Sequence, residues 1–85
     1  MQVSVYDTYV RTTSGVVMHF DILVPTDVNK EEVYTYGRQY LELKSVNYLQ
    51  FDTNECRFCH IAQADESVVA SIGRQGYHIL ELENC

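Results

Sequence analysis

The residues Cys56, Cys59 and His60 form the string C-x-x-C-H, which is the motif of this chain most directly linked to chemistry. In an exported protein the string is typical of covalent haem attachment, in which two thiols add to the haem vinyl groups and the histidine ligates the iron. In a cytosolic protein the same spacing indicates a metal site or a redox dithiol. It can also carry no chemistry, because a cysteine packs as a small hydrophobic side chain.

Covalent haem is disfavoured by the rest of the chain. Residues 1–7 alternate like a strand and show no basic region followed by an apolar one, so we expect no export signal. The pattern is rich in strands, whereas a c-type cytochrome of this length is expected to be mostly helical. We therefore expect a cytoplasmic protein without covalent haem.

A thiophilic metal is the next alternative. Cys56 and Cys59 have the spacing of a zinc knuckle, but structural zinc takes four ligands and the sequence holds no second pair of this kind. The further ligands would have to come from His60, His78, His19 or Cys85. Cys85 and His78 can join the knuckle only if the last strand lies beside the cysteine segment. No cofactor is predicted from these residues; zinc, or alternatively iron, is the metal that such a site would take.

Thiol redox chemistry is a third alternative for the same segment. A C-x-x-C motif lowers the pKa of its first thiol most when it begins a helix. Here Glu55 opposes thiolate formation at Cys56, and Arg57 favours it. The chain has three cysteines, and an odd number in a reducing compartment argues against a framework of disulfides.

A second constellation consists of Asp7, His19 and Asp21. If residues 11–15 form the loop of a hairpin, Asp7 faces His19 across the strands, and Asp21 lies two residues along on the same face. Neighbouring carboxylates favour the charged form of a histidine, which can then act as an acid, a base or a ligand. Cross-strand pairs of this kind also occur on solvated sheet faces without a function, and a register shift of one residue would separate them.

The elements that position these residues begin with a hairpin. Residues 2–10 and 16–24 alternate apolar and polar side chains, which predicts two strands. The core face of the second strand would consist of Val16, Met18, Phe20, Ile22 and Val24. A helix is predicted over residues 28–44, because Asn29 and Glu32 fit a capping box. Gly37 within its apolar stripe indicates a close approach of this helix to the sheet.

The second half of the chain predicts two more strands, another helix and a last strand. The strands are expected over residues 48–51, 57–63 and 77–83, and the helix over residues 66–74, with Asp65 as its N-cap and Gly76 as its stop. The order is β-β-α-(β)-β-α-β. It indicates one domain over residues 1–85, an α+β two-layer sandwich with a mixed sheet and both helices on one face.

The charge of the chain limits its partners. The net charge is −6, and the six Lys and Arg residues are scattered along the sequence. Nucleic acids and anionic membranes are therefore disfavoured. No apolar run approaches the ~18 residues that a membrane span requires.

Two pairs of motifs resemble a known family. The N-terminal part contains VYDTYV and MHFDILVP, and the C-terminal part contains ECRFCH and GYHILELENC. Together they resemble a family of small, uncharacterised bacterial proteins described only as a domain of unknown function. The resemblance implies a cytosolic α+β domain without an assigned activity, and it supplies no catalytic residues. The family does not look like the cytochromes, which further disfavours covalent haem.

The function expected from these observations is a binding or interaction module without demonstrable catalysis. Its partner would be another protein, or a second copy at an exposed strand edge. The alternative is a metal-binding or thiol-redox protein that uses the C-x-x-C-H segment. A third hypothesis is a small enzyme that uses His19 with Asp7 and Asp21.

Overall fold

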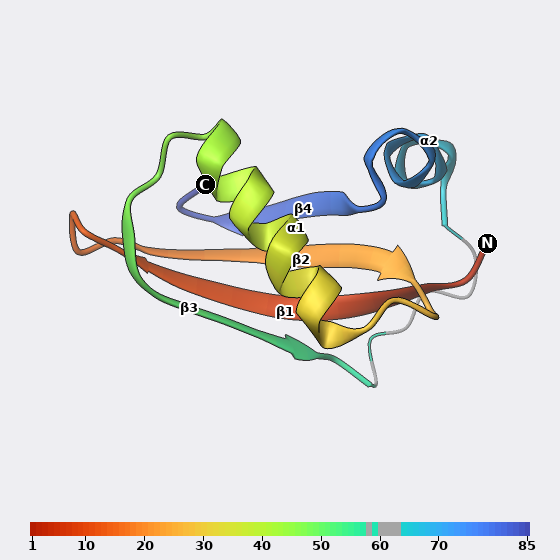
Figure 1. Ribbon diagram of the computed structural model, residues 1–85, viewed down its shortest axis with the longest axis horizontal. Coiled ribbons are helices and arrows are strands. Elements are labelled where there is room, and N and C mark those ends of the chain that lie inside the picture. The colour runs from red at the N-terminus through yellow and green to blue at the C-terminus, as the bar shows by residue number, and fades with distance from the viewer. Residues whose placement is uncertain (58, 60–63) are drawn as a thin grey trace.

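Four strands and two helices make up the computed structural model, which describes residues 1–57, 59 and 64–85 (Figure 1). The elements follow in the order β1 (Val3–Thr12), β2 (Val17–Pro25), α1 (Lys30–Leu43), β3 (Tyr48–Glu55), α2 (Glu66–Gln75) and β4 (His78–Glu83). The order of strands in the sheet is β3-β1-β2-β4. The α+β class is confirmed, and so is the N-terminal hairpin.

The sheet differs from the prediction in the direction of its strands. All three described strand pairs, β1 with β2, β1 with β3 and β2 with β4, are antiparallel, whereas a mixed sheet was expected. Two strands joined through a helix become parallel neighbours only when the second strand pairs directly with the first. Here α1 carries the chain past β1, and α2 carries it from one edge of the sheet to the other.

The two faces of the sheet are covered by different helices. On the α1 face, which carries the even-numbered residues of β1 and β2, Phe20 and Ile22 pack with Leu41 of α1. On the α2 face, which carries the odd-numbered residues, Leu23 packs with Ile72 of α2. The expectation that both helices share one face was therefore wrong. The physical reason is that Val3, Val5 and Leu23 make one end of the α2 face apolar as well. The apolar side of α2 can therefore be buried there.

The ends of the helices lie close to their predicted positions, because the capping signals are local. The Asn29 side chain accepts a hydrogen bond from the Glu32 backbone at 2.9 Å, and Asp65 accepts one from Val68 at 3.0 Å. Gly76 ends α2 with a φ of 96°, in the left-handed region.

Gly37 marks the place where α1 approaches the sheet most closely. A Cβ atom at this position would overlap the ring of Phe51 and lie 3.3 Å from Cδ1 of Ile22. The close approach predicted from the sequence is confirmed, since only a residue without a side chain fits between the helix and these two groups.

The predicted strand over residues 57–63 lies largely outside the described residues. Strand β3 ends at Glu55, and Arg57 lies in a turn. Within that turn the backbone N–H of Cys59 donates to the carbonyl of Cys56 at 3.1 Å. The strand expected over residues 48–51 is therefore longer than predicted and ends just before the cysteines.

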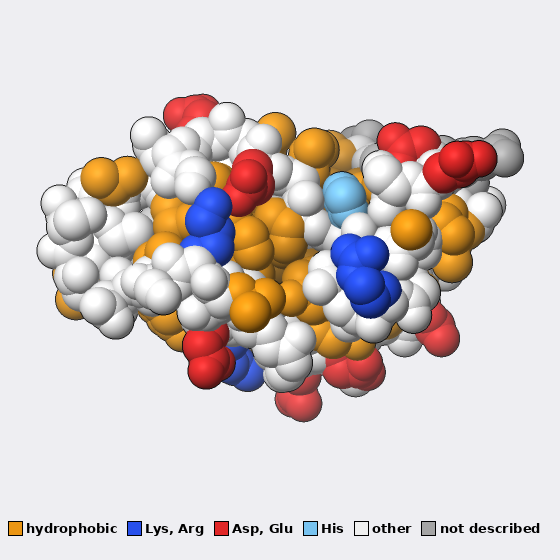
Figure 2. Space-filling model, turned by 90° about the horizontal axis from the view of Figure 1, so that it is seen from above, with side chains coloured by type: hydrophobic (Ala, Val, Ile, Leu, Met, Phe, Trp, Pro, Cys, Tyr) orange, Lys and Arg blue, Asp and Glu red, His pale blue; other side chains and the backbone are white. Residues whose placement is uncertain are grey.

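Charged side chains on the drawn surface are dispersed. Figure 2 shows Lys and Arg side chains that lie apart from one another, most of the acidic side chains near the margin with one beside a basic group, and hydrophobic side chains between them. No described helix is long and apolar enough to cross a membrane.

Candidate functional site

The helix α2 covers only one end of the α2 face. At that end Val3, Val5 and Leu23 are buried beneath it. Further along the hairpin the same face is exposed, with Tyr9 at 50% and Val17 at 44% of their accessible surface. We call this exposed part the open half of the α2 face; it is the surface on which the polar residues of the hairpin lie.

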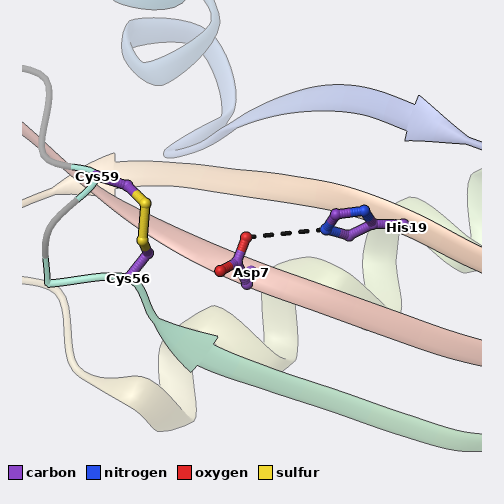
Figure 3. Close-up of a disulfide and its surroundings, with 4 residues drawn as sticks. All are labelled: Asp7, His19, Cys56 and Cys59. Atoms are coloured by element: carbon purple, nitrogen blue, oxygen red, sulfur yellow. Dashed lines mark ion pairs between the residues drawn. A yellow bond between two sulfur atoms is a disulfide. The ribbon is translucent and has the colours of Figure 1, made fainter.

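Asp7, His19 and Asp21 meet on this open half, and we call them the Asp–His–Asp cluster (Figure 3 draws Asp7 and His19). Their candidate ligand atoms all lie within 4.8 Å of one another. Nε2 of His19 is 3.8 Å from Oδ1 of Asp7. The sequence-based grouping of these three residues on one face is thus present in the structure, and they come from the two central strands of the sheet.

The register within the cluster differs from the prediction. Asp7 pairs with Asp21, so it lies diagonally from His19 and does not face it directly. The hairpin is centred one residue later than expected, because the Thr12 hydroxyl hydrogen-bonds the Val16 backbone and closes the turn there. Moving the centre by one residue shifts every pairing by two, and two is the period of a strand. The three side chains therefore stay on one face.

The electrostatics of the cluster are unbalanced. Nε2 of His19 and Oδ1 of Asp21 are shielded from solvent and have no hydrogen-bond partner in the part of the chain that the structure describes. Burial and then the neighbouring Asp7 carboxyl raise the pKa of Asp21 to about 6, and His19 opposes the shift. The cluster thus holds two carboxylates against a single imidazole.

Tyr9 is a residue of the site that the sequence did not indicate. It pairs with His19 across the strands, and its ring stacks on the imidazole with the centroids 4.2 Å apart and the planes inclined by 6°. This stacking fixes the plane of the imidazole, so that its Nε2 atom stays directed at the carboxylates. The signal was hidden by the register, since the expected pairing placed Asp7 opposite His19.

The open half also contains a small hollow of about 180 Å³. It is lined by Tyr9, Arg11, Val17, Gln50 and Asp52. Tyr9, which lines the hollow, also stacks on His19, whereas Asp7, His19 and Asp21 are not among the lining residues.

The two cysteines of the C-x-x-C-H string are joined by a disulfide, with their Cα atoms 5.2 Å apart (Figure 3). In this state neither sulfur is a thiolate, so neither can ligate a metal. His60 lies outside the described residues.

The remaining predicted metal ligands lie at the other edge of the sheet. Cys56 donates its N–H to Val5 at 2.8 Å, Val5 pairs with Leu23, and Leu23 pairs with His78. Three strand spacings, about 14 Å, therefore separate Cys56 from His78. His78 also shares a hydrogen bond of 2.9 Å with Ser71. The last strand does not lie beside β3, so the condition for a metal shared with His78 or Cys85 is not met.

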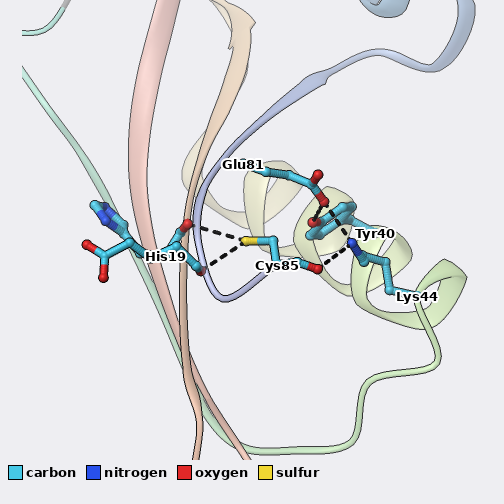
Figure 4. Close-up of polar contacts among 6 residues, drawn as sticks. His19, Tyr40, Lys44, Glu81 and Cys85 are labelled. Atoms are coloured by element: carbon cyan, nitrogen blue, oxygen red, sulfur yellow. Dashed lines mark hydrogen bonds and ion pairs between the residues drawn. The ribbon is translucent and has the colours of Figure 1, made fainter.

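Cys85 belongs to a separate polar group (Figure 4). Its thiol donates to the His19 carbonyl at 3.4 Å. Nearby, Glu81 accepts hydrogen bonds from Lys44, at 2.8 Å, and from Tyr40. The bonds from Lys44 and then Tyr40 lower the pKa of Glu81, while burial and then Glu81 raise that of Tyr40. These hydrogen bonds fasten α1 to β4.

Comparisons with known proteins agree with this fold. The model of the family described as "Domain of unknown function (DUF2024)" matches residues 1–82. The NMR structure of protein NE1680 from Nitrosomonas europaea is similar, with a TM-score of 0.69 and 27% identity over 100% of this chain and 99% of that chain. No curated protein matches.

Proposed function

The chain belongs to this family of domains of unknown function, and we propose that it is a binding module that takes a divalent metal ion at the Asp–His–Asp cluster. One observation carries the proposal: His19 Nε2 and Asp21 Oδ1 are shielded and have no hydrogen-bond partner within residues 1–57, 59 and 64–85, and the Asp7 carboxylate is 3.8 Å from Nε2. A shielded polar atom left unpaired costs about 1–3 kcal/mol. A cation bound between the two would satisfy both atoms and neutralise the repulsion between the carboxylates.

The spacing of the cluster fits one ion. Bonds of about 2.0–2.2 Å to oxygen and nitrogen place two ligand atoms of one ion at most about 4.4 Å apart. The candidate atoms lie within 4.8 Å of one another. Side-chain movements of less than about 1 Å would therefore close the site. The paired central strands and the stacked Tyr9 ring hold the ligands near this geometry in advance.

The ligand types indicate which metals to test. Carboxylates suit hard cations such as Mn²⁺, and imidazole suits Zn²⁺ and Fe²⁺. Two carboxylates with one imidazole favour these three ions over Cu⁺, which selects sulfur ligands. Three protein ligands also leave coordination positions open to a further ligand.

Other ligands have less support. The net charge of −6 and the dispersed cations argue against nucleic acid. The hollow on the open half of the α2 face, about 180 Å³, is smaller than most substrate pockets, so we do not propose catalysis at the Asp–His–Asp cluster.

A metal titration tests the proposal directly. Tag-free, metal-free protein is titrated with Zn²⁺ and with Mn²⁺ by calorimetry, and NMR follows the broadening that Mn²⁺ causes. We expect one ion per chain and broadening centred on Asp7, His19 and Asp21. His19→Ala should weaken binding at least tenfold, as loss of a ligand does. His78→Ala is the matched control and should bind as the wild type does, because His78 bonds to Ser71. Absence of site-centred broadening, or equal losses in the two variants, would contradict the proposal.

Thiol exchange is a second candidate, which the Cys56–Cys59 disulfide favours. Cys59 is exposed and Cys56 is partly buried, so an external thiol would reach the Cys59 sulfur first. The test equilibrates the protein in glutathione buffers and measures the reduced fraction by thiol alkylation. A disulfide that resists reduction throughout the range of these buffers would exclude exchange and leave a structural bond.

A further inference from the structure

A second and larger hollow, of about 470 Å³, lies where α1 ends and β3 begins. Its lining residues come from one side of α1, from the loop that follows and from the start of β3: Arg38, Glu42, Ser45, Val46, Asn47 and Tyr48. It shares none of these residues with the Asp–His–Asp cluster or with the smaller hollow beside Tyr9. Its volume lies within the range of about 300–1,000 Å³ that small-molecule sites occupy.

Contacts within the chain hold the walls of this hollow in place. Val46 packs against the core of the α1 face, and the Tyr48 ring meets the Phe51 ring edge to face, with the centroids 6.0 Å apart. The N–H of Val46 donates to the Leu41 carbonyl at 3.0 Å, as in the Schellman motif that closes many helices. Ser45, with a φ of 56°, occupies the left-handed position of that motif, which glycine usually fills. The hollow is therefore formed in advance of any ligand, which lowers the cost of binding.

Two side chains of opposite charge line the hollow without pairing with each other. Arg38 and Glu42 are four residues apart on α1, in the order in which such a pair stabilises a helix less. Neither takes part in an ion pair within the part of the chain that the structure describes. Arg38 donates one hydrogen bond to the Thr35 hydroxyl at 3.3 Å, but a guanidinium has five N–H donors. Both exposed charges are thus available to a ligand in the hollow.

The end of α1 strengthens this separation of charge. The carbonyl end of a helix carries a partial negative charge, which favours a cation there. Glu42 lies in the last turn of α1, and the nearby Lys44 ammonium is bonded to Glu81 at 2.8 Å. Arg38 lies about 6 Å earlier along the helix axis. The hollow therefore offers a position for a cation at Glu42 and a position for an anion at Arg38.

We infer that the protein binds a free α-amino acid in this hollow, with the ligand carboxylate on Arg38 and the ligand ammonium on Glu42. A single carbon atom separates the two charged groups of such a molecule, so a small ligand in the hollow can meet both side chains. A guanidinium forms two parallel hydrogen bonds to a carboxylate. The Tyr48 ring, 37% exposed, offers an apolar surface to the side chain of the ligand. This site does not depend on the proposed metal site.

An NMR titration of metal-free protein with L-phenylalanine and two derivatives tests the inference, with the Ser45 and Tyr48 amide shifts as the signal. L-Phenylalaninamide lacks the carboxylate, and N-acetyl-L-phenylalanine lacks the ammonium group. We expect L-phenylalanine to bind at least tenfold more tightly than either derivative, since each missing charge removes a charge-assisted hydrogen bond. Arg38→Gln should remove its advantage over the amide, and Glu42→Gln should remove its advantage over the acetyl derivative.

The matched controls are Arg74→Gln and Glu66→Gln on α2, because neither residue lines the hollow. Both variants should keep both advantages of L-phenylalanine. Equal binding of the amide or of the acetyl derivative to the wild type would contradict a free amino acid and indicate a peptide terminus as the ligand. Advantages that survive in Arg38→Gln and Glu42→Gln, or the absence of shifts with all three ligands at millimolar concentration, would overturn the site.

Discussion

The two faces of the hairpin differ in how they treat shielded polar groups. On the α1 face, Thr8 and Thr53 are fully buried, and their hydroxyls hydrogen-bond each other at 2.8 Å. On the α2 face, His19 Nε2 and Asp21 Oδ1 are also shielded, but no described group forms a hydrogen bond with either atom. Satisfied polar groups stabilise a core, whereas unsatisfied ones are tolerated mainly at functional sites. The comparison indicates that the α1 face contributes satisfied, buried groups to the core, and the open half of the α2 face is where we propose binding.

The largest difference between the faces should appear on removing an aromatic ring from each. Phe20→Ala on the α1 face should lower the free energy of unfolding by about 3–5 kcal/mol, because its ring is fully buried. Tyr9→Ala on the α2 face should cost no more than about 1 kcal/mol, because Tyr9 is 50% exposed. Urea unfolding measures both. Losses of similar size would show that the open half of the α2 face is part of the core.

A smaller effect is expected from the buried threonine pair. Thr8→Val leaves the Thr53 hydroxyl without its partner and should cost about 1–3 kcal/mol. The double variant Thr8→Val/Thr53→Val removes both hydroxyls and should recover part of that loss. A double-mutant cycle by chemical denaturation gives the coupling. If the two losses simply add, the pair contributes nothing specific to the α1 face.

The close approach of α1 can be tested with two glycines. Gly37→Ala places a Cβ against Phe51 and should destabilise the fold by about 1–2 kcal/mol despite the better helix propensity of alanine. Gly73→Ala in α2 is the control, because a Cβ there has no neighbour within 4 Å. The control should gain up to about 1 kcal/mol in thermal or urea unfolding. A gain of stability in both variants would mean that α1 and Phe51 can move apart without destabilising the fold, which would contradict the close approach.

The smallest predicted effect is a gain of stability on the α2 face. The pKa of Asp21 is raised from 3.8 to about 6, so the folded state binds this proton more tightly than the unfolded state. In metal-free wild type, the contribution of Asp21 should therefore fall as the pH rises from about 4 to about 6, and stay low above that. Asp21→Asn should remove this dependence and exceed the wild type by about 1 kcal/mol at pH 7.5, a figure reduced for partial exposure. Urea unfolding of both proteins between pH 4 and pH 8 checks the sign. A wild type that is more stable than the variant at pH 7.5 would contradict the strain inferred for the cluster.

Local patterns predicted much of this molecule. The period of two along the hairpin identified a buried face with Phe20 and Ile22, and Val16 alone of that predicted set is exposed. The caps Asn29 and Asp65 located the helix starts, because they act on backbone groups within three residues. Gly37 indicated the close approach of α1, because a glycine within the apolar stripe of a helix is itself a local signal.

Patterns that depend on distant parts of the chain were predicted less well. The position of α2 follows from the apolar end of the second face, and the antiparallel sheet follows from connections that pass over a strand. The stacking of Tyr9 on His19 depends on where the hairpin turns. Each is decided by packing between segments far apart in the sequence, which a local pattern does not contain.

By itself, the sequence determined that Asp7, His19 and Asp21 share one face of a hairpin, because alternation survives any shift of pairing by two residues. Only the tertiary structure decided that α2 leaves this half of the face exposed and that β3 and β4 lie at opposite edges of the sheet. The order of strands in a sheet depends on which surfaces the helices can bury. That order separates Cys56 from His78, and the Asp–His–Asp cluster is therefore where we propose a metal.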